Sequence, residues 1–139
     1  MPKIILCRGI QGSGKSTWAR KWVLEDPENR VRFNNDDIRN MLGKYWVPSR
    51  EYLVQDLKTT CFISAASSQY DIVIDNMNLN PREIEEWKRL ASSYDYELEF
   101  KDFFIPLEVC IERDSKRENP IGKEVIEATY QRYKHIIGK

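Results

Sequence analysis

The chain has 139 residues, a length that suits a single domain spanning residues 1–139. Hydrophobic residues make up 41% of the sequence, which is enough for a packed core and excludes a disordered tail. Lysine and arginine together number 22, as do aspartate and glutamate, so the net charge of zero argues against a broad basic face for duplex nucleic acid.

The first half of the chain alternates short apolar runs with helical patterns. Residues 4–7 (IILC) lie between Pro2 and Gly9, and an apolar run this short favours a buried strand. Apolar residues at three-to-four spacing predict the helices. The elements expected in this half are a strand at 4–7, a helix at 15–25, a strand at 31–34, a helix at 36–43 and a helix at 48–68.

The second half continues the alternation. DIVID, residues 71–75, places three β-branched residues between two aspartates, which is typical of a buried central strand. Asn80 and Pro81 are an N-cap and a first-turn proline, and they predict the start of a helix. The elements expected here are a strand at 71–75, a helix from 81, a strand within 94–105, a helix from 106 and a last helix through 121–137.

Strands that alternate with helices predict an α/β fold whose parallel β-sheet is covered by helices on both faces. A charged segment, RDSKREN at residues 113–119, interrupts the helical pattern near the end of the chain. No apolar run approaches the roughly 18 residues that span a bilayer, so we expect a cytoplasmic, intracellular protein with no membrane partner.

A glycine-rich stretch, GIQGSGKST at residues 9–17, lies between the first expected strand and the first expected helix. It matches the phosphate-binding pattern G-x-x-x-x-G-K-[ST], in which glycines turn backbone amides inward and the helix start adds unpaired N–H groups. In that pattern the lysine contacts the nucleotide phosphates and the serine hydroxyl binds Mg²⁺. The alternative is a flexible turn without a ligand. The residues expected to contact the nucleotide are Gly12, Ser13, Gly14, Lys15, Ser16 and Thr17.

The sequence NNDDIR, residues 34–39, lies where the second expected strand ends, at the sheet edge where ligands of open α/β folds bind. There Asp36 could deprotonate a hydroxyl while Arg39, one helical turn later, binds an acceptor phosphate. The alternative is that Asp36 and Asp37 only cap a helix. The chain lacks the NKxD motif of GTPases and is small for a motor ATPase, which favours a kinase.

Four motifs together resemble the bacteriophage polynucleotide 5′-kinase domain. GSGKSTWAR, DDxR, NLNP and R-x-S-K-R follow one another in the order of that family, and the likeness extends over most of the chain. The resemblance implies a P-loop kinase fold with three adenylate-kinase-like layers. It also implies transfer of the γ-phosphate of ATP, with Mg²⁺, to a 5′-hydroxyl end of DNA or RNA.

The resemblance assigns roles to individual residues. Asp36 becomes the general base, Arg39 the contact to the acceptor phosphate, and Arg117 a contact to the transferring phosphates. The residues implied are Asp36, Lys15, Arg39 and Arg117 for catalysis, Arg113 and Arg117 on a lid near 112–120 for ATP, and Ser16 and Asp75 for the metal. Three alternatives stay open: a solvated charge run in place of the lid, a kinase for a small metabolite or nucleoside, and a nucleotide-binding switch or adaptor without chemistry.

The sequence departs from the family at three places. Asn35 stands where the family has an arginine, and the segment between DDxR and NLNP is shorter. DNMNLNP is one residue longer than its counterpart, so either Asp75 or Asn76 can occupy the polar position after the strand. The phosphatase domain of the phage enzyme is missing from these residues, so we expect phosphorylation without removal of 3′-phosphates. A phage origin and a homo-oligomer are both open.

Three aromatic residues follow the DDxR motif closely: Tyr45, Trp46 and Tyr52. Lys44 and Arg50 lie beside them, and aromatic rings next to cations are typical of surfaces that stack single-stranded nucleic acid. These rings are therefore expected either to form a wall for the acceptor or to pack between two helices, as most aromatic side chains do.

Overall fold

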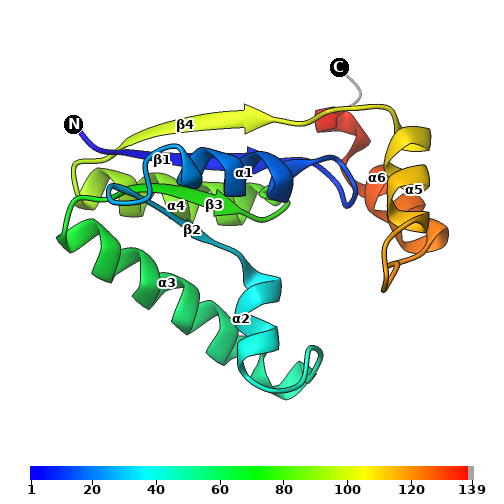
Figure 1. Ribbon diagram of the computed structural model, residues 1–139, viewed down its shortest axis with the longest axis horizontal. Coiled ribbons are helices and arrows are strands. Elements are labelled where there is room, and N and C mark those ends of the chain that lie inside the picture. Colours follow the sequence, from blue (N-terminus) through cyan, green and yellow to red (C-terminus); the bar gives the residue numbers. More distant parts are fainter. Residues whose placement is uncertain (138–139) are drawn as a thin grey trace.

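The computed structural model describes residues 1–137, which form a four-stranded parallel β-sheet with helices around it (Figure 1). The strands are β1 (Lys3–Arg8), β2 (Arg30–Phe33), β3 (Asp71–Asp75) and β4 (Glu97–Asp102). The helices are α1 (Lys15–Leu24), α2 (Asn35–Met41), α3 (Glu51–Ser67), α4 (Pro81–Ser93), α5 (Leu107–Ser115) and α6 (Lys123–Ile137), and a 3₁₀ turn, η1 (Pro48–Arg50), precedes α3. None of the helices within residues 1–137 is long and apolar enough to cross a membrane.

The strand order is β2-β3-β1-β4, so β3 and β1 are the central strands. All three pairings are parallel, and Cys7 of β1 lies opposite Asp75 of β3 in the register. Because parallel strands end at the same edge of a sheet, the glycine-rich loop after β1 and the polar residues after β3 come together there.

Alternate residues of the central strands face opposite sides of the sheet. Ile4 of β1 packs in one core cluster with Phe62 of α3 and Trp87 of α4. Ile5, the next residue, packs in another cluster with Ala19 of α1. Helix α1 therefore covers one face and helices α3 and α4 cover the other, which confirms the predicted three-layer α/β fold.

Helices α5 and α6 do not cover a face of the sheet. They lie beyond the carboxyl ends of β1 and β4, at the right of Figure 1. Their core is a separate cluster that joins Cys110 of α5 and Ile126 of α6 to Ile10 and Leu79. This cluster places the last two helices beside the glycine-rich loop.

The expected elements all occur, and their ends shift by a few residues. The strand expected within 94–105 covers only 97–102, because Tyr94 forms the C-cap of α4 and residues 103–106 lead into α5. The helix expected from Pro48 begins with one 3₁₀ turn before it becomes α-helical at Glu51. Two of the three cysteines, Cys7 and Cys110, are buried thiols.

Phe62 provides a test of this core. Its ring is fully buried, and it makes edge-to-face contacts with Trp87, Tyr94 and Tyr96 at centroid distances of 5.4, 5.7 and 5.8 Å. We expect Phe62→Ala to lower the free energy of unfolding by about 3–5 kcal/mol, measured by urea denaturation, because a cavity replaces the ring. The adjacent Ile63→Ala, on the exposed side of α3, should cost less than about 1 kcal/mol. Equal losses for the two variants would contradict this core assignment.

Candidate active site

The loop between β1 and α1 lines a cleft of about 800 Å³. Gly12 and Gly14 have φ angles of 80° and 98°, in the left-handed region that favours glycine. A Cβ on Gly12 would lie 2.5 Å from the backbone oxygen of Cys110, so α5 packs too closely for any larger residue. The backbone of the loop is thus confined between α1 and α5.

The first turn of α1 opens into this cleft without a side-chain cap. Gly14 is its N-cap and makes no side-chain hydrogen bond, and the turn contains no acidic residue. By contrast, asparagine side chains cap two other helices, Asn34 at α2 and Asn80 at α4. Uncapped amides at a helix start attract anions, so the start of α1 is suited to a phosphate group.

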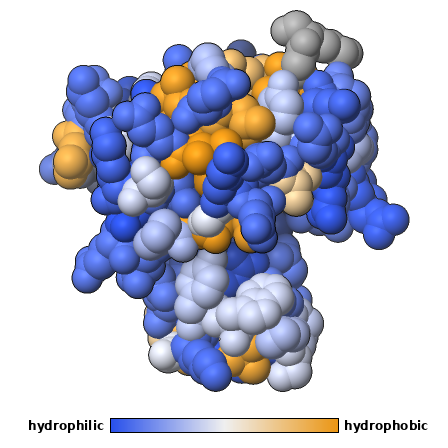
Figure 2. All heavy atoms as spheres, turned by 90° about the vertical axis from the view of Figure 1, so that its right-hand side faces the viewer, coloured by the Kyte–Doolittle hydropathy of each residue, from blue (hydrophilic) through white to orange (hydrophobic). Residues whose placement is uncertain are grey.

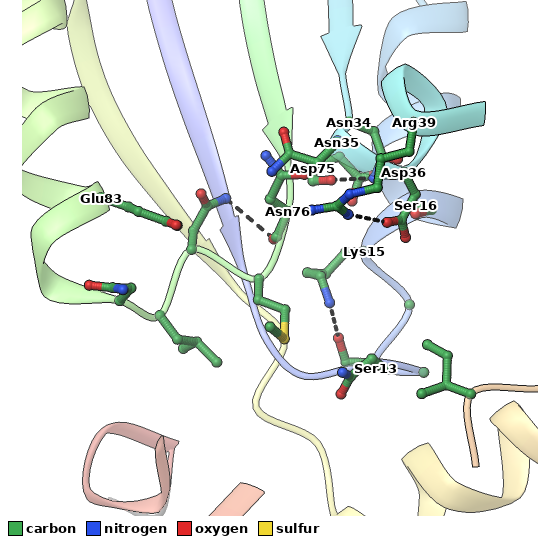
Figure 3. Close-up of a pocket in the computed structure, with 18 of the residues that line it drawn as sticks. Ser13, Lys15, Ser16, Asn34, Asn35, Asp36, Arg39, Asp75, Asn76 and Glu83 are labelled. Carbon is green, nitrogen blue, oxygen red and sulfur yellow. Dashed lines mark hydrogen bonds and ion pairs between the residues drawn. The ribbon is translucent and has the colours of Figure 1, made fainter. Parts of the chain in front are cut away.

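Lys15 is 9% exposed and folds back over the loop. Its ammonium donates to the backbone oxygens of Gly9 and Ile10, both at 2.8 Å. It also donates to Ser13 Oγ at 3.3 Å (Figure 3). Burial lowers the pKa of Lys15 from 10.5 to about 8, and the negative charge of Asp75 opposes this effect. A phosphate would offer this ammonium charged acceptors in place of the loop carbonyls.

Asp75 ends β3 and is 1% exposed. Its Oδ2 accepts hydrogen bonds from Arg32 of β2, with Nε and Nη2 both at 2.7 Å. Its Oδ1 is buried and has no hydrogen-bond partner within the described part of the chain. A buried carboxylate oxygen that lacks a donor, in a cleft also lined by the Ser16 hydroxyl, fits the hard oxygen ligands that Mg²⁺ prefers.

No cluster of three or more histidine, cysteine or acidic side chains within residues 1–137 could hold a metal ion. At nucleotide sites Mg²⁺ takes one or two protein oxygens, and the phosphates and water supply its other ligands. The Ser16 hydroxyl and Asp75 Oδ1, which is unpaired within residues 1–137, are oxygens of this kind that line the cleft.

Asp75 and Asn76, the two candidates for the polar position after β3, have different contacts. Asp75 lies near Lys15 and binds Arg32. The Asn76 side-chain oxygen instead accepts a hydrogen bond from the backbone N–H of Asn35, at 2.9 Å. Asn76 therefore joins the end of β3 to the start of α2, while the charge of Asp75 acts on Lys15.

Arg39 of α2 is held by two carboxylates. Its Nε and Nη2 donate to Oε2 and Oε1 of Glu51 at 3.0 and 2.7 Å. Its Nη1 donates to Asp36 Oδ1 at 2.7 Å (Figure 3). The two hydrogen bonds to Glu51, more than the one to Asp36, raise the pKa of Arg39. The Tyr45 hydroxyl also donates to Asp36 Oδ1, at 2.8 Å. Asp36 thus does not act as the N-cap of α2, since Asn34 has that position.

The three aromatic residues after α2 are exposed. Tyr45, Trp46 and Tyr52 are 46%, 53% and 69% exposed, so they do not pack between the helices. Of the three, Tyr45 lines the cleft. The alternative of an ordinary helix–helix contact is therefore wrong for these rings.

The predicted lid segment near 112–120 begins inside α5, which continues to Ser115. The charge run ends the helix as expected, since α5 stops at Ser115. Within the run Asp114 is 2% exposed, and its carboxylate accepts the backbone N–H groups of Ile121 and Gly122 at 3.0 and 2.9 Å. Arg113 Nη1 approaches Gly14 of the loop. Arg117 is half-exposed, and its Nη1 lies 3.6 Å from Asp114 Oδ1.

The structure brings every predicted site residue to one cleft: Gly12, Ser13, Gly14, Lys15, Ser16, Thr17, Asp36, Arg39, Asp75, Arg113 and Arg117. Sequence reasoning missed Arg32 and Glu51, the ion-pair partners of Asp75 and Arg39, since neither belongs to a motif. The parallel pairing of β2 with β3 is the signal that indicates Arg32, because it brings this residue close to the end of β3, where Asp75 lies. It also missed Arg132 and Tyr133 of α6, which line the same cleft.

Known proteins that are similar to this chain include a viral enzyme, a chain of an RNA repair complex and a bacterial kinase. A protein of Autographa californica nuclear polyhedrosis virus, named as a bifunctional polynucleotide kinase/RNA ligase, is 25% identical over 94% of this chain and 21% of its own length. A chain in the structure of the Pnkp1/Rnl/Hen1 RNA repair complex is 26% identical, with a TM-score of 0.82 over 96% of this chain and 44% of its own length. The APS kinase CysC of Mycobacterium tuberculosis, with 18% identity and a TM-score of 0.60 over 83% of this chain and 69% of its own, shares the fold.

The chain thus spans about a fifth of the viral relative and less than half of the chain in the repair complex. Its likeness to these proteins agrees with a P-loop kinase fold built around the loop of residues 9–17. The match to the AAA domain family takes in residues 4–137, nearly the whole sequence, and the chain therefore belongs to that family.

Proposed function

We propose that this chain is a polynucleotide 5′-kinase domain, which transfers the γ-phosphate of ATP to the 5′-hydroxyl of a DNA or RNA end with the help of Mg²⁺. The observation that carries the proposal is the pairing of Asp36 with Arg39, at 2.7 Å, in the cleft that also holds Lys15. The hydroxyl of such an acceptor requires a carboxylate that can take its proton, and the neighbouring backbone phosphate requires a cation. Asp36 and Arg39 are these two groups, beside a phosphate-binding loop. The names of the viral and repair-complex relatives support the same substrate class.

The donor phosphates would bind at the start of α1. The amides of residues 12–17 and the Lys15 ammonium would contact the phosphate oxygens, because both groups carry positive charge and their residues line the cleft. Arg113 lies against the loop and Arg117 stands half-exposed at the end of α5, so each can reach a bound phosphate from the lid side. Together these cations would neutralise the charge that develops on the leaving group.

The acceptor would bind between α2 and α3. A phosphate of the acceptor strand would take the place of Glu51 or share Arg39 with it, since the guanidinium already presents its fork to a carboxylate. Both hydrogen bonds that Asp36 accepts within the described residues reach Oδ1, which leaves Oδ2 for the 5′-hydroxyl. The hydroxyl and the donor phosphate would then meet above Lys15.

In the transfer itself, the 5′-oxygen forms a bond to the γ-phosphorus while the bond to the bridging β–γ oxygen breaks. The proton of the hydroxyl passes to Asp36, and ADP leaves with the negative charge, which Lys15 and Arg117 stabilise. Bound Mg²⁺, held by Ser16 and Asp75, would supply further neutralisation of the β- and γ-phosphates.

The acceptor class is tested with labelled ATP, offered with a 5′-hydroxyl oligonucleotide and separately with a panel of nucleosides and sugars. We expect label on the oligonucleotide, in an amount that depends on a 5′-hydroxyl and is lost when that end already carries a phosphate. Label that appears only on the small molecules would overturn the proposal in favour of a small-metabolite kinase.

Asp36→Asn tests the general base. The amide cannot accept the proton, so we expect kcat to fall by about 10²–10⁴-fold while ATP binding, measured by calorimetry, stays within about twofold. Asp56→Asn on the exposed side of α3 serves as the control for loss of one negative charge. Turnover that survives Asp36→Asn would exclude the general-base role.

Lys15→Ala tests the donor site. We expect the variant to lose at least about 10²-fold in turnover, because no other ammonium replaces the contact to the transferring phosphate. Circular dichroism should show an intact fold, and Lys21→Ala, on the exposed face of the same helix, should keep its activity. Undiminished transfer in Lys15→Ala would refute the assignment of the loop.

A further inference from the structure

Tyr45 and Trp46 form what we call the aromatic ledge, an exposed pair of rings in the loop between α2 and η1. They are 46% and 53% exposed, whereas Trp87 in the core is 2% exposed. Figure 2 shows side chains of intermediate hydropathy gathered on the lower part of the molecule, at the height where α2 and this loop lie in Figure 1. Large rings left in water at the rim of a cleft mark a surface for a ligand.

The ledge lies beside Arg39. The guanidinium carbon is 5.9 Å from the centroid of the Tyr45 ring and 5.7 Å from that of Trp46. The Tyr45 hydroxyl reaches further in, to Asp36 at 2.8 Å. The two rings therefore extend outward from the residues that would bind the acceptor's hydroxyl and phosphate, and Tyr45 lines the cleft itself.

The backbone under the ledge is held in place before any ligand binds. Arg50 donates from Nη1 to the backbone oxygen of Leu42 and from Nη2 to that of Lys44, both at 3.2 Å. These two hydrogen bonds join the loop to the start of α3. A rigid support lowers the entropic cost of ordering a binding surface when the ligand arrives.

The two exposed rings of the ledge and the cations beside them indicate which kind of ligand would bind there. Two exposed ring faces next to a guanidinium, with the exposed ammonium of Lys44 beside them, match a chain of alternating flat bases and phosphate charges. An apolar protein partner would gain little from the two cations, and a phosphate ion alone would make no use of the rings. Nucleobases stack on aromatic side chains whatever their sequence.

We propose that Tyr45 and Trp46 stack a nucleobase of one of the first two nucleotides of the acceptor, and that this contact sets the affinity for polynucleotide ends. The proposal rests on the 5′-kinase function and adds specificity residues to it. The rings would fix the strand at its bases while Arg39 holds a phosphate and Asp36 receives the hydroxyl. They act on binding, so their loss should change KM more than kcat.

The test is a double-mutant cycle in which one change removes an aromatic ring from the protein and the other removes a base from the acceptor, and kcat/KM is measured for each combination. Wild type and Trp46→Ala are each offered a single-stranded 5′-hydroxyl oligonucleotide and the same strand with an abasic residue at its first or its second nucleotide. We expect Trp46→Ala to lose about tenfold in kcat/KM on the complete strand, mainly through KM, and less than about twofold on the abasic strand that lacks the stacked base. Tyr45→Phe, which keeps the ring, should retain the wild-type sensitivity to the missing base.

Phe100→Ala is the matched control, since Phe100 of β4 is a partly exposed ring away from the cleft, and its centroid lies 4.2 Å from the guanidinium carbon of Arg8 of β1. It should behave as wild type with both acceptors. An equal loss for Trp46→Ala on complete and abasic strands would overturn the proposal, because the ring would then act only through Arg39. No loss on either strand would overturn it as well.

Failure of the proposed function has a different signature. If neither wild type nor any variant phosphorylates an oligonucleotide, the 5′-kinase assignment fails. The aromatic ledge is then tested separately: the affinity of each protein for fluorescently labelled versions of the same strands is measured by fluorescence anisotropy. A tenfold weaker affinity of Trp46→Ala for the complete strand alone would support the ledge. Indistinguishable affinities would overturn it.

Discussion

A buried ammonium at the carboxyl edge of a parallel sheet is the constraint on which the rest of this site depends. Lys15 is surrounded by the loop that precedes it, and its three hydrogen-bond acceptors all come from residues 9–13. That geometry requires a loop that turns the carbonyl groups of Gly9 and Ile10 toward the ammonium. Glycine at residue 12 makes this possible, because α5 leaves no room for a Cβ. The packing of α5 and α6 against the end of the sheet is thus part of the phosphate site.

The end of β3 connects the two sides of the cleft. Asp75 balances the charge of Lys15 on the donor side, and Arg32 forms an ion pair with the buried carboxylate of Asp75. Asn76, the next residue, binds the first backbone N–H of α2, from which Asp36 and Arg39 project. Two consecutive residues therefore set the position of the acceptor groups relative to the donor groups. A buried Asn78 secures the same edge by donating to the backbone oxygens of Cys7 and Ile74 at 2.7 and 3.0 Å.

Much of this arrangement was predictable from the sequence, for identifiable physical reasons. Strands such as DIVID and the asparagine–proline start of α4 are local signals, and the glycine-rich loop carries its own conformational demands. Arg32 and Glu51 were not predictable in this way, because each acts through a partner far along the chain or on another element. The depth of Asp114 was also hidden: a charged residue within RDSKREN is buried because its carboxylate closes a turn that the sequence does not mark. The exposure of Tyr45 and Trp46 was hidden as well, because aromatic side chains are mostly core residues and only the tertiary packing shows that these two are exposed.

The most direct measurement is a crystal structure of the chain with Mg²⁺, a non-hydrolysable ATP analogue and a short 5′-hydroxyl oligonucleotide. The account predicts that the triphosphate lies along residues 12–17 with its terminal phosphate at Lys15. It also predicts that the 5′-hydroxyl lies within hydrogen-bond distance of Asp36 and in line with the terminal phosphorus. A complex in which the oligonucleotide binds elsewhere, or in which Asp36 faces away from the terminal phosphate, would contradict it.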